Sequence, residues 1–472
     1  MNIIGRKKEQ ELLSDCVDSG RPEFLVVYGR RRVGKTYLIR EFFNNEFTFY
    51  ATGVNNVNTK EQLEYFNDSL IEYGCDEKTA PKTWREAFSR LKELILSPET
   101  RRDPVSGKMI VFLDEVPWMD TVKSSFRPAL DHFWNSFGST REDLLLIVCG
   151  SATSYIIKKI IGDQGGFHNR ITRSIRLMPF SLKECEAFYA SNDIPISRLE
   201  IIQSYMVFGG IPYYLNLINR RMSLTQNIDA LLFNPNGQLH YEYERLFSSL
   251  FRNPGKHLSI IQSLSRKGTG LTRKEIVDDT GIADGELLSV ALEDLEHCGF
   301  IRKYNNYIKK KKEGYYQVID PFVLFYNKVI AGGKTTSWIH YMGTPGYNAW
   351  TGFAFEIVCL NHIDRFKEVL GIAGIESAEY SWRSQTSNPG AQIDLLIDRT
   401  DNCINVCEMK YSGSPYVIDA EYEKKLRYKQ ECFRNETKTE KALHLTLVTS
   451  SGLSHNSHSG VVVNEIDADE LF

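Results

Sequence analysis

The chain has 472 residues, of which 42% are hydrophobic and 25% are charged, proportions that are ordinary for a folded globular protein. Its formal net charge of -3 excludes a basic field over the whole protein, so any contact with nucleic acid has to use local patches. No stretch approaches the roughly 18 consecutive apolar residues of a membrane helix, no apolar signal core opens the sequence, and the nine cysteines include no C-x-x-C pair. These features predict a cytoplasmic protein of about three domains that does not enter a membrane.

The first 180 residues alternate short apolar runs with helical stretches. The runs are apolar along their whole length, which is typical of strands buried on both faces of a parallel sheet. They lie at residues 24–28, 47–51, 109–113 and 144–149. This pattern predicts an α/β fold that begins with a doubly wound parallel-sheet domain at residues 1–180.

The rest of the chain divides into three further predicted parts. Residues 181–250 predict a helical lid with a Gly/Pro break, and residues 251–335 predict helices followed by a hairpin. A Gly-rich stretch at 331–346 predicts a linker. Residues 346–472 predict another α/β domain, with a helix near 350–364, strands near 391–398 and 403–410, a helix near 416–435 and a strand near 443–449.

A phosphate-binding motif, G-x-x-x-x-G-K-[ST], follows the first apolar run. Its eight consecutive residues are Gly29, Arg30, Arg31, Arg32, Val33, Gly34, Lys35 and Thr36. The glycines let backbone N–H groups surround phosphate oxygens, Lys35 is expected to reach the β- and γ-phosphates, and the Thr36 hydroxyl is expected to ligate Mg²⁺. The helix that begins at Thr36 directs its positive end at the nucleotide. A buried strand before the motif and a helix after it favour ATP binding over a chance match.

Two acids end the third apolar run, Asp114 and Glu115. The carboxyl edge of such a sheet is where ligands bind, so both side chains are expected beside the phosphate motif. Asp114 is predicted to hold Mg²⁺ and Glu115 to orient or deprotonate the attacking water. A strand that merely ends in solvated acids is the simpler alternative.

Several of these segments resemble the prokaryotic archaeal-type ATPase family, near the origin-recognition and STAND branches of the AAA+ class. The resemblance rests on residues 4–9, 29–36, 113–118, 150–152, 177–182, 208–212 and 320–322, and thus covers most of residues 1–330. It implies an ATPase that uses ATP and Mg²⁺. It also implies that Ser151 is a polar sensor near the γ-phosphate, where a plain turn residue is the alternative. By the same resemblance Arg170 is a candidate arginine finger, which requires a homo-oligomer because it acts on a neighbouring subunit; a solvated basic loop is the alternative.

Residues 255–319 resemble a winged helix, with a second helix at 284–296 and a hairpin wing that ends in lysines 309–312. The resemblance implies DNA binding, with the wing lysines on phosphates. The second helix, however, carries a series of acids that phosphate would repel: Asp284, Glu286, Glu293, Asp294 and Glu296. An interdomain adaptor is therefore the alternative role.

The C-terminal part places Asp394 on one predicted strand and Glu408 and Lys410 on the next. Because strand side chains alternate, Glu408 and Lys410 share a face, and Asp394 can lie opposite them. Two carboxylates can hold a divalent metal ion that activates water, while the lysine stabilises developing charge. The set resembles the core of PD-(D/E)XK nucleases, in which Glu356 corresponds to the acidic residue on the helix.

Three features complicate this nuclease-like interpretation. Ile393 stands where the motif name expects proline, and Asp398 is a competing carboxylate on the same strand. His455 and His458 form a spaced pair, but they lie in a Ser/Asn/Gly-rich stretch that favours a solvated turn. An inactive relic of the fold, or an ordinary polar hairpin, remains open as the alternative.

Two functions are consistent with this sequence. The first is an ATP-hydrolysing protein that acts on DNA and carries a metal-dependent nuclease domain. The second is a nucleotide-switched binding protein, in a signalling or defence role, whose nuclease-like domain is inactive.

Overall fold

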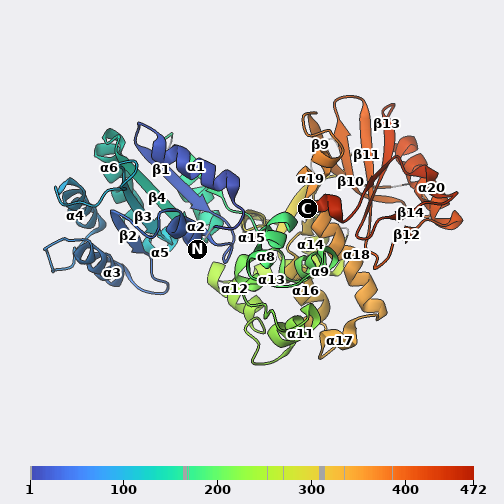
Figure 1. The fold of residues 1–472 in the computed structure, drawn as a ribbon, viewed down its shortest axis with the longest axis horizontal. Helices are drawn as coiled ribbons and strands as arrows, with labels where there is room; N and C mark the ends of the chain where they lie inside the picture. The colour runs from blue at the N-terminus through green and yellow to red at the C-terminus, as the bar shows by residue number, and fades with distance from the viewer. Residues whose placement is uncertain are drawn as a thin grey trace. The chain divides into compact units, whose positions relative to one another are not determined.

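In the computed structural model the chain forms two compact units, Met1–Pro179 and Phe180–Phe472. The residues that the structure describes are 3–162, 167, 169–251, 253–268, 270–307, 314–333, 335–384 and 386–472. Figure 1 colours the first unit from blue to teal and the second from green to red. No helix in these described ranges combines the length and apolarity needed to span a bilayer.

The first unit is built on a five-stranded sheet in the order β2-β3-β4-β1-β5. All of its strand pairs are parallel. The strands are β1 (Glu23–Tyr28), β2 (Phe49–Thr52), β3 (Met109–Asp114), β4 (Leu144–Gly150) and β5 (Arg173–Arg176). Every residue of β3 and β4 is buried, which agrees with their uniformly apolar sequences. The predicted parallel sheet of the first domain is therefore confirmed.

Helices on both faces of this sheet bury its apolar side chains. They are α1 (Lys7–Asp18), α2 (Lys35–Phe42), α3 (Thr59–Glu72), α4 (Trp84–Leu96), α5 (Val116–Met119), α6 (Phe126–Ser136) and α7 (Thr153–Tyr155). Helices α3, α4 and α6 close one core, where the Trp84 and Phe126 rings meet edge to face at 4.9 Å. This core fixes β3, whose last residue is Asp114.

The second unit begins with helices. They are α8 (Leu182–Ser191), α9 (Arg198–Phe208), α10 (Pro212–Leu215), α11 (Leu224–Ile228) and α12 (Glu242–Leu250). Ser181 and Ser197 start α8 and α9 with capping boxes, in which each serine and the glutamate three residues later satisfy one another's backbone N–H groups.

Residues 255–318 form what we call the middle module. It contains α13 (Gly255–Arg266), β6 (Leu271–Thr272), α14 (Arg273–Thr280), α15 (Glu286–His297), β7 (Ile301–Asn305) and β8 (Gly314–Val318). The strands form an antiparallel sheet in the order β6-β8-β7. The lysine run at 309–312, on which the predicted wing contacts depended, lies outside the described residues.

The C-terminal part forms a second five-stranded sheet, in the order β15-β13-β11-β10-β9. Its strands are β9 (Ser377–Arg383), β10 (Gln392–Arg399), β11 (Cys403–Lys410), β13 (Ala442–Thr449) and β15 (Asn464–Ile466). Strands β9, β10 and β11 pair antiparallel, whereas β13 pairs parallel to β11. The accompanying elements are α16 (Pro321–Phe325), α17 (Trp338–Tyr341), α18 (Pro345–Leu360), α19 (Ile363–Val369), β12 (Tyr416–Val417), α20 (Ala420–Thr437) and β14 (Leu453–Ser454).

The stretch 331–346 is not the simple linker that its glycines predict. It contains α17, whose buried Trp338 meets the Trp350 ring edge to face at 5.3 Å. Helix α18, which carries Trp350, also contacts α9, α16 and β11. Helix α18 therefore joins the helical region, through α9, to α16 and the C-terminal sheet within one compact unit.

Candidate nucleotide site and acidic site

The loop between β1 and α2 has the backbone geometry of a phosphate-binding loop. Gly29 has φ 149°, and a Cβ there would lie 2.2 Å from the Leu177 carbonyl oxygen. Gly34, at φ 93°, stands at the start of α2, and within the described residues no side chain caps that helix. The first N–H groups of α2 are thus available to an anion, which the helix dipole also favours.

Lys35 lies over this loop. Its side chain is 5% exposed, and its Nζ donates to the carbonyl oxygens of Gly29 at 3.0 Å and Arg30 at 3.1 Å. The two carbonyl contacts hold the Lys35 ammonium group at the mouth of the loop, where a bound phosphate would meet it. The three arginines of the motif differ in exposure: Arg30 is buried, Arg31 is exposed, and Arg32 is half-buried with φ 72°.

Thr36 and Asp114 bring the two halves of the predicted nucleotide site together. The Thr36 hydroxyl donates to Asp114 Oδ2 at 2.7 Å, although the residues are 78 positions apart. Hydroxyl and carboxylate oxygens are the ligands that Mg²⁺ prefers, and the ion commonly takes one or two carboxylates plus nucleotide phosphates. This pair therefore fits the metal of an ATP complex.

Glu115 is held in an unusual backbone conformation at the end of β3. Its φ of 47° is left-handed, and it leads directly into α5, which has proline near its start. Its Oε2 accepts from the Ser151 N–H at 3.2 Å and from the Ser151 hydroxyl at 2.9 Å. Such a conformation costs on the order of 1–2 kcal/mol in a non-glycine residue, so surrounding contacts must maintain it. Ser151, at the end of β4, is one of those contacts.

Two further arginines lie in the first unit, one exposed and one buried against the phosphate loop. Arg170 is exposed in a turn before β5. Arg6 is buried and its Nη2 donates to the Val33 carbonyl oxygen at 3.3 Å, so the segment before α1 braces the phosphate loop. The sequence predicts no role for Arg6, although Arg6 belongs to the 4–9 segment on which the family resemblance partly rests.

In the C-terminal sheet, β10 and β11 bring the predicted acids together. Leu395 pairs with Cys407 in the antiparallel ladder. Asp394 and Glu408 are the next residues on the two strands, so they lie opposite each other at one end of the ladder. Glu356, on α18, belongs to the same group, because burial and the nearby Asp394 charge raise its pKa. We call Glu356, Asp394, Glu408 and Lys410 the acidic site.

Glu408 is the most firmly held residue of the acidic site. Its carboxylate, 6% exposed, meets Lys410 Nζ at 2.9 Å and Lys429 Nζ at 2.8 Å, and accepts from the Tyr422 hydroxyl at 2.6 Å. Burial alone would raise the pKa of Glu408, but Lys410 and Lys429 outweigh it and lower that pKa to about 2. Glu408 is thus a permanent anion.

Asp394 and Glu356 have the opposite electrostatics. Burial and the Glu408 charge raise the pKa of Asp394, and burial and the Asp394 charge raise that of Glu356 well above its usual range. Asp394 Oδ1 accepts from Gln392 Nε2 at 2.6 Å, and Glu356 Oε1 from Gln317 Nε2 at 2.9 Å. Crowded carboxyl groups of this kind fit a divalent cation, which would relieve their repulsion.

Within the described ranges, no group of three or more His, Cys, Asp or Glu side chains is placed so that it could hold a metal ion. The fit is instead to an ion held by Asp394 and Glu408 and completed by water and phosphate, which is usual for Mg²⁺.

Asp398, His455 and His458, which the sequence offered as further candidates, have partners outside the acidic site. Asp398 accepts from Lys441 Nζ at 2.6 Å. His458 Nδ1 lies 2.8 Å from Glu423 Oε2, and the exposed His455 lies 3.4 Å from Glu465 Oε1. The two histidines therefore contact different acids, as expected for a polar turn.

Four residues around the acidic site were not predicted to belong to it: Arg302, Gln317, Tyr422 and Lys429. Lys429 had a signal, since it belongs to a basic stretch of the helix after the strands. Gln317 reaches Glu356 across 39 positions, and no spacing pattern marks such a contact.

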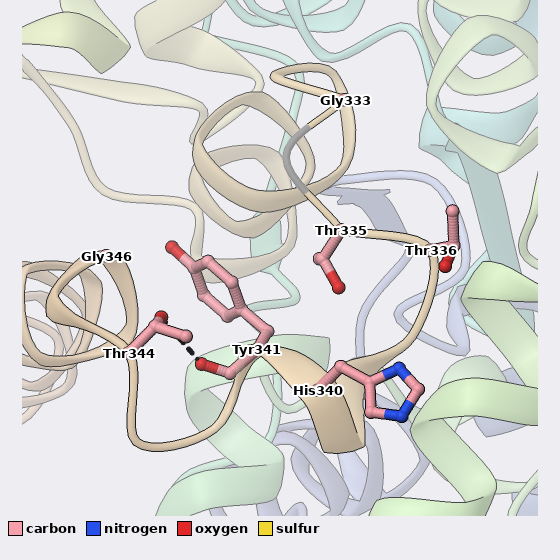
Figure 2. Close-up of a pocket in the computed structure, with 7 residues that line it drawn as sticks. All are labelled: Gly333, Thr335, Thr336, His340, Tyr341, Thr344 and Gly346. Atoms are coloured by element: carbon pink, nitrogen blue, oxygen red, sulfur yellow. Dashed lines mark hydrogen bonds between the residues drawn. The ribbon is translucent and has the colours of Figure 1, made fainter.

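A separate cavity of about 530 Å³ lies around α17 (Figure 2). Glycines, threonines and two aromatic residues line it, and Figure 2 shows the Thr344 hydroxyl bonded to the Tyr341 carbonyl. The lining residues are Gly333, Thr335, Thr336, His340, Tyr341, Thr344 and Gly346. None of them belongs to the nucleotide site or the acidic site.

Residues 4–218 match the sequence family described as an ATPase domain predominantly from Archaea. Among proteins, MJECL04 of Methanocaldococcus jannaschii is 26% identical over 369 residues, which are 75% of this chain and 76% of that one. The ATP-binding protein MJ0423 of the same organism is 42% identical over 44 residues, 9% of this chain and 75% of its own.

Two solved structures are similar to parts of the chain. The Walker-type ATPase PABY2304 of Pyrococcus abyssi has a TM-score of 0.47 and 18% identity, covering 69% of this chain and 96% of that one. The ORC2 protein of Aeropyrum pernix, in ADPNP–ADP complexes, has a TM-score of 0.41 and 12% identity, covering 76% and 95%.

Proposed function

We propose that the chain hydrolyses ATP and acts on DNA through a metal-dependent nuclease-like domain, starting from the match of residues 4–218 to an ATPase domain predominantly from Archaea. The observation that carries the first half is the array of Thr36, Asp114, Glu115 and Ser151 beside the phosphate loop. Backbone N–H groups of residues 29–34 and Lys35 bind the phosphates, and Thr36 and Asp114 hold Mg²⁺. Glu115 orients the attacking water.

The C-terminal half of the proposal rests on the order of elements around the acidic site. Helix α18, strands β9 to β11, helix α20 and strand β13 follow one another as in the PD-(D/E)XK fold that the sequence resembles. Asp394 and Glu408 hold the metal ion, which polarises a scissile phosphate and lowers the pKa of a bound water. Lys410 stabilises the charge that develops, and Glu356 completes the acidic face.

The middle module is proposed to be a winged helix that joins these parts, within boundaries of 181–250, 251–335 and 346–472 for lid, winged helix and nuclease-like domain. Exposed positions of α15 include Glu286, Leu287, Val290 and Glu293, and the helix contains no lysine or arginine. Phosphate contact through α15 is therefore unfavourable. Arg170, being exposed, is available to a neighbouring subunit, and the proposal includes a homo-oligomer in which it serves as an arginine finger.

ATP hydrolysis rates with and without single- and double-stranded DNA test the first half. Lys35→Ala should abolish hydrolysis, and DNA should stimulate the wild-type rate if both halves act as one machine. Hydrolysis that persists in Lys35→Ala would show that the phosphate loop is not the site.

Plasmid cleavage in Mg²⁺ and ATP tests the second half. Asp394→Ala should remove cleavage, whereas the matched control Asp398→Asn should retain it, because Asp398 lies on the same strand but pairs with Lys441. Equal activity of wild type and Asp394→Ala would reject the site.

A second function is favoured by one observation at the acidic site. Both oxygens of Glu408 already have partners in Lys410, Lys429 and Tyr422. In a nucleotide-switched binding protein, these contacts would keep the domain an inactive docking surface. No divalent metal would then support cleavage, and Lys35→Ala would change partner affinity or oligomeric state instead.

A further inference from the structure

The β7–β8 hairpin of the middle module is fixed to the C-terminal sheet. Asn306, just after β7, forms a bridge with Ser381 of β9, and the Tyr307 N–H donates to the Ser381 carbonyl at 3.1 Å. The Tyr307 ring meets those of Tyr380 at 5.4 Å and Phe433 at 5.2 Å. The hairpin is thus anchored beside the strand next to the one that carries Asp394.

From this position the hairpin directs Gln317 at the acidic site. Gln317, on β8, is 5% exposed and makes three hydrogen bonds. Its Nε2 donates to Glu356 Oε1 at 2.9 Å and to the Gly268 carbonyl at 2.6 Å. Its Oε1 accepts from Arg302 Nε at 2.9 Å. One amide therefore fixes both an acid of the site and a neighbouring guanidinium.

Arg302, on β7, presents a cation to the same carboxyl groups. Its Cζ lies 4.7 Å from the centre of the Tyr304 ring, so the guanidinium stacks on an aromatic face. Glu356 and Asp394 act on its charge, while burial lowers its pKa. Its Nε donates to Gln317 Oε1, whereas its Nη1 and Nη2 donate no hydrogen bond to any residue in the described part of the chain.

We propose that Arg302 binds a DNA phosphate at the acidic site, an inference that rests on the nuclease-like function proposed above. Gln317 is a positioning residue that orients both Arg302 and Glu356. Lys410 and Lys429 each contact Glu408, which offsets part of their charge, whereas Arg302 keeps its two Nη groups for a substrate. Its planar guanidinium, held by Tyr304 and Gln317, can offer two parallel N–H groups to phosphate oxygens.

The matched control is the next residue of the same strand. Lys303 is exposed, and because strand side chains alternate it faces away from Arg302. Removing its charge changes the net charge of the chain as much as removing that of Arg302 does. A difference between the two variants therefore reports position rather than overall charge.

Binding of the full chain to a fluorescein-labelled DNA duplex, followed by anisotropy in Ca²⁺, tests the assignment of Arg302. Arg302→Gln should weaken binding by about 10- to 100-fold, the loss of one charged hydrogen-bonded contact. The slope of log affinity against log salt should fall by about 1. Lys303→Gln should remain within about 2-fold of wild type, and Arg302→Lys should lie between them because a lysine cannot reproduce the bidentate contact.

A double-mutant cycle tests the role of Gln317. Gln317→Met, which keeps length but removes the amide, should weaken binding as Arg302→Gln does, and the double variant should be no weaker than Arg302→Gln alone. Additive losses would contradict action through Arg302. Thermal melting of each variant separates these effects from unfolding.

The outcomes distinguish this inference from the function on which it rests. A wild-type chain that binds no DNA overturns both. Wild-type DNA binding that Arg302→Gln leaves unchanged, or that Lys303→Gln weakens equally, overturns the phosphate assignment alone. Absent cleavage with the predicted Arg302 effect on binding rejects the nuclease activity and leaves Arg302 as a DNA contact.

Discussion

The Ser151 hydroxyl offers a sharp test of how the ATPase site is organised. Two roles compete, since a family resemblance implies contact with the γ-phosphate, whereas here the hydroxyl donates to Glu115 Oε2 at 2.9 Å. Ser151→Ala removes that bond. It leaves the bond from the Ser151 backbone N–H at 3.2 Å, so Glu115 keeps one of its two donors.

The size of the effect follows from this geometry. A hydrogen bond to a charged group contributes roughly 1.5–3 kcal/mol, and the remaining N–H places the loss at the lower end. About 1.5 kcal/mol of lost orientation of the attacking water corresponds to roughly a 10-fold fall in kcat. The contacts of Lys35 and Thr36 are untouched, so the affinity for ATP should stay within about 2-fold.

Steady-state ATP hydrolysis and calorimetric titration measure these two quantities separately. The double variant Glu115→Gln/Ser151→Ala should be no slower than Glu115→Gln, because the hydroxyl acts through that carboxylate. Affinity for ATP that falls tenfold while affinity for ADP is unchanged would refute the positioning role and support the sensor role.

Two further predictions concern backbone space and protonation. Gly29→Ala places a Cβ 2.2 Å from the Leu177 carbonyl oxygen at φ 149°, so calorimetry should detect no ATP binding and the Tm should fall; a wild-type Tm with full binding would contradict the loop geometry. Burial lowers the pKa of His362 below its usual 6.5, while its Nε2 accepts from the Leu182 N–H at 3.0 Å. The unfolded chain therefore binds the proton more tightly. The contribution of His362 to the free energy of unfolding, taken as the difference between wild type and His362→Gln, should be flat above about pH 6.5 and fall below it, by at most about 1.4 kcal/mol per pH unit. Urea titrations of both proteins at pH 5.5 and 7.5 measure this slope, and a larger contribution at pH 5.5 would reverse the assignment.

The elements that the sequence predicted well are those whose chemistry is local. Strands β3 and β4 are buried along their entire length, so an unbroken apolar run identifies them. Helix α18 begins at Pro345, five residues before the predicted start, because Thr344 caps it and Pro345 occupies its first turn. The Thr-Pro pair that marks this start is visible in the sequence.

The strands that escaped prediction lie at or near sheet edges. In β5 only Ile175 of four residues is buried, so no apolar pattern marks the strand. Strand β9, at the other sheet's edge, is largely half-buried, so it shows no clear alternation of apolar and polar residues. Edge strands expose one side to solvent, and their sequences therefore record pairing only weakly.

Sequence motifs predicted the main residues of the candidate nucleotide site, but not the contacts that hold those residues in place. The Gly29–Thr36 loop and Asp114–Glu115 follow from local spacing, whereas the Glu115–Ser151 contact depends on β4 lying between β3 and β1. Likewise, Gln317 meets Glu356 because a hairpin packs on a different sheet. Such contacts are set by tertiary packing, which has no period in the sequence.

The position of Arg302 also decides which part of the middle module faces DNA. In the proposed winged helix α15 would be the recognition helix, yet its exposed Leu287, at 66% exposure, closely follows Asp284 and Glu286. Leu287→Lys adds a positive charge there without removing a recorded contact. If α15 lay near phosphates, this lysine would raise affinity and steepen the salt dependence by close to 0.9. We expect affinity within about 2-fold of wild type in the anisotropy assay, because phosphate approaches the hairpin side of the module, and a tenfold gain would place α15 on the DNA instead.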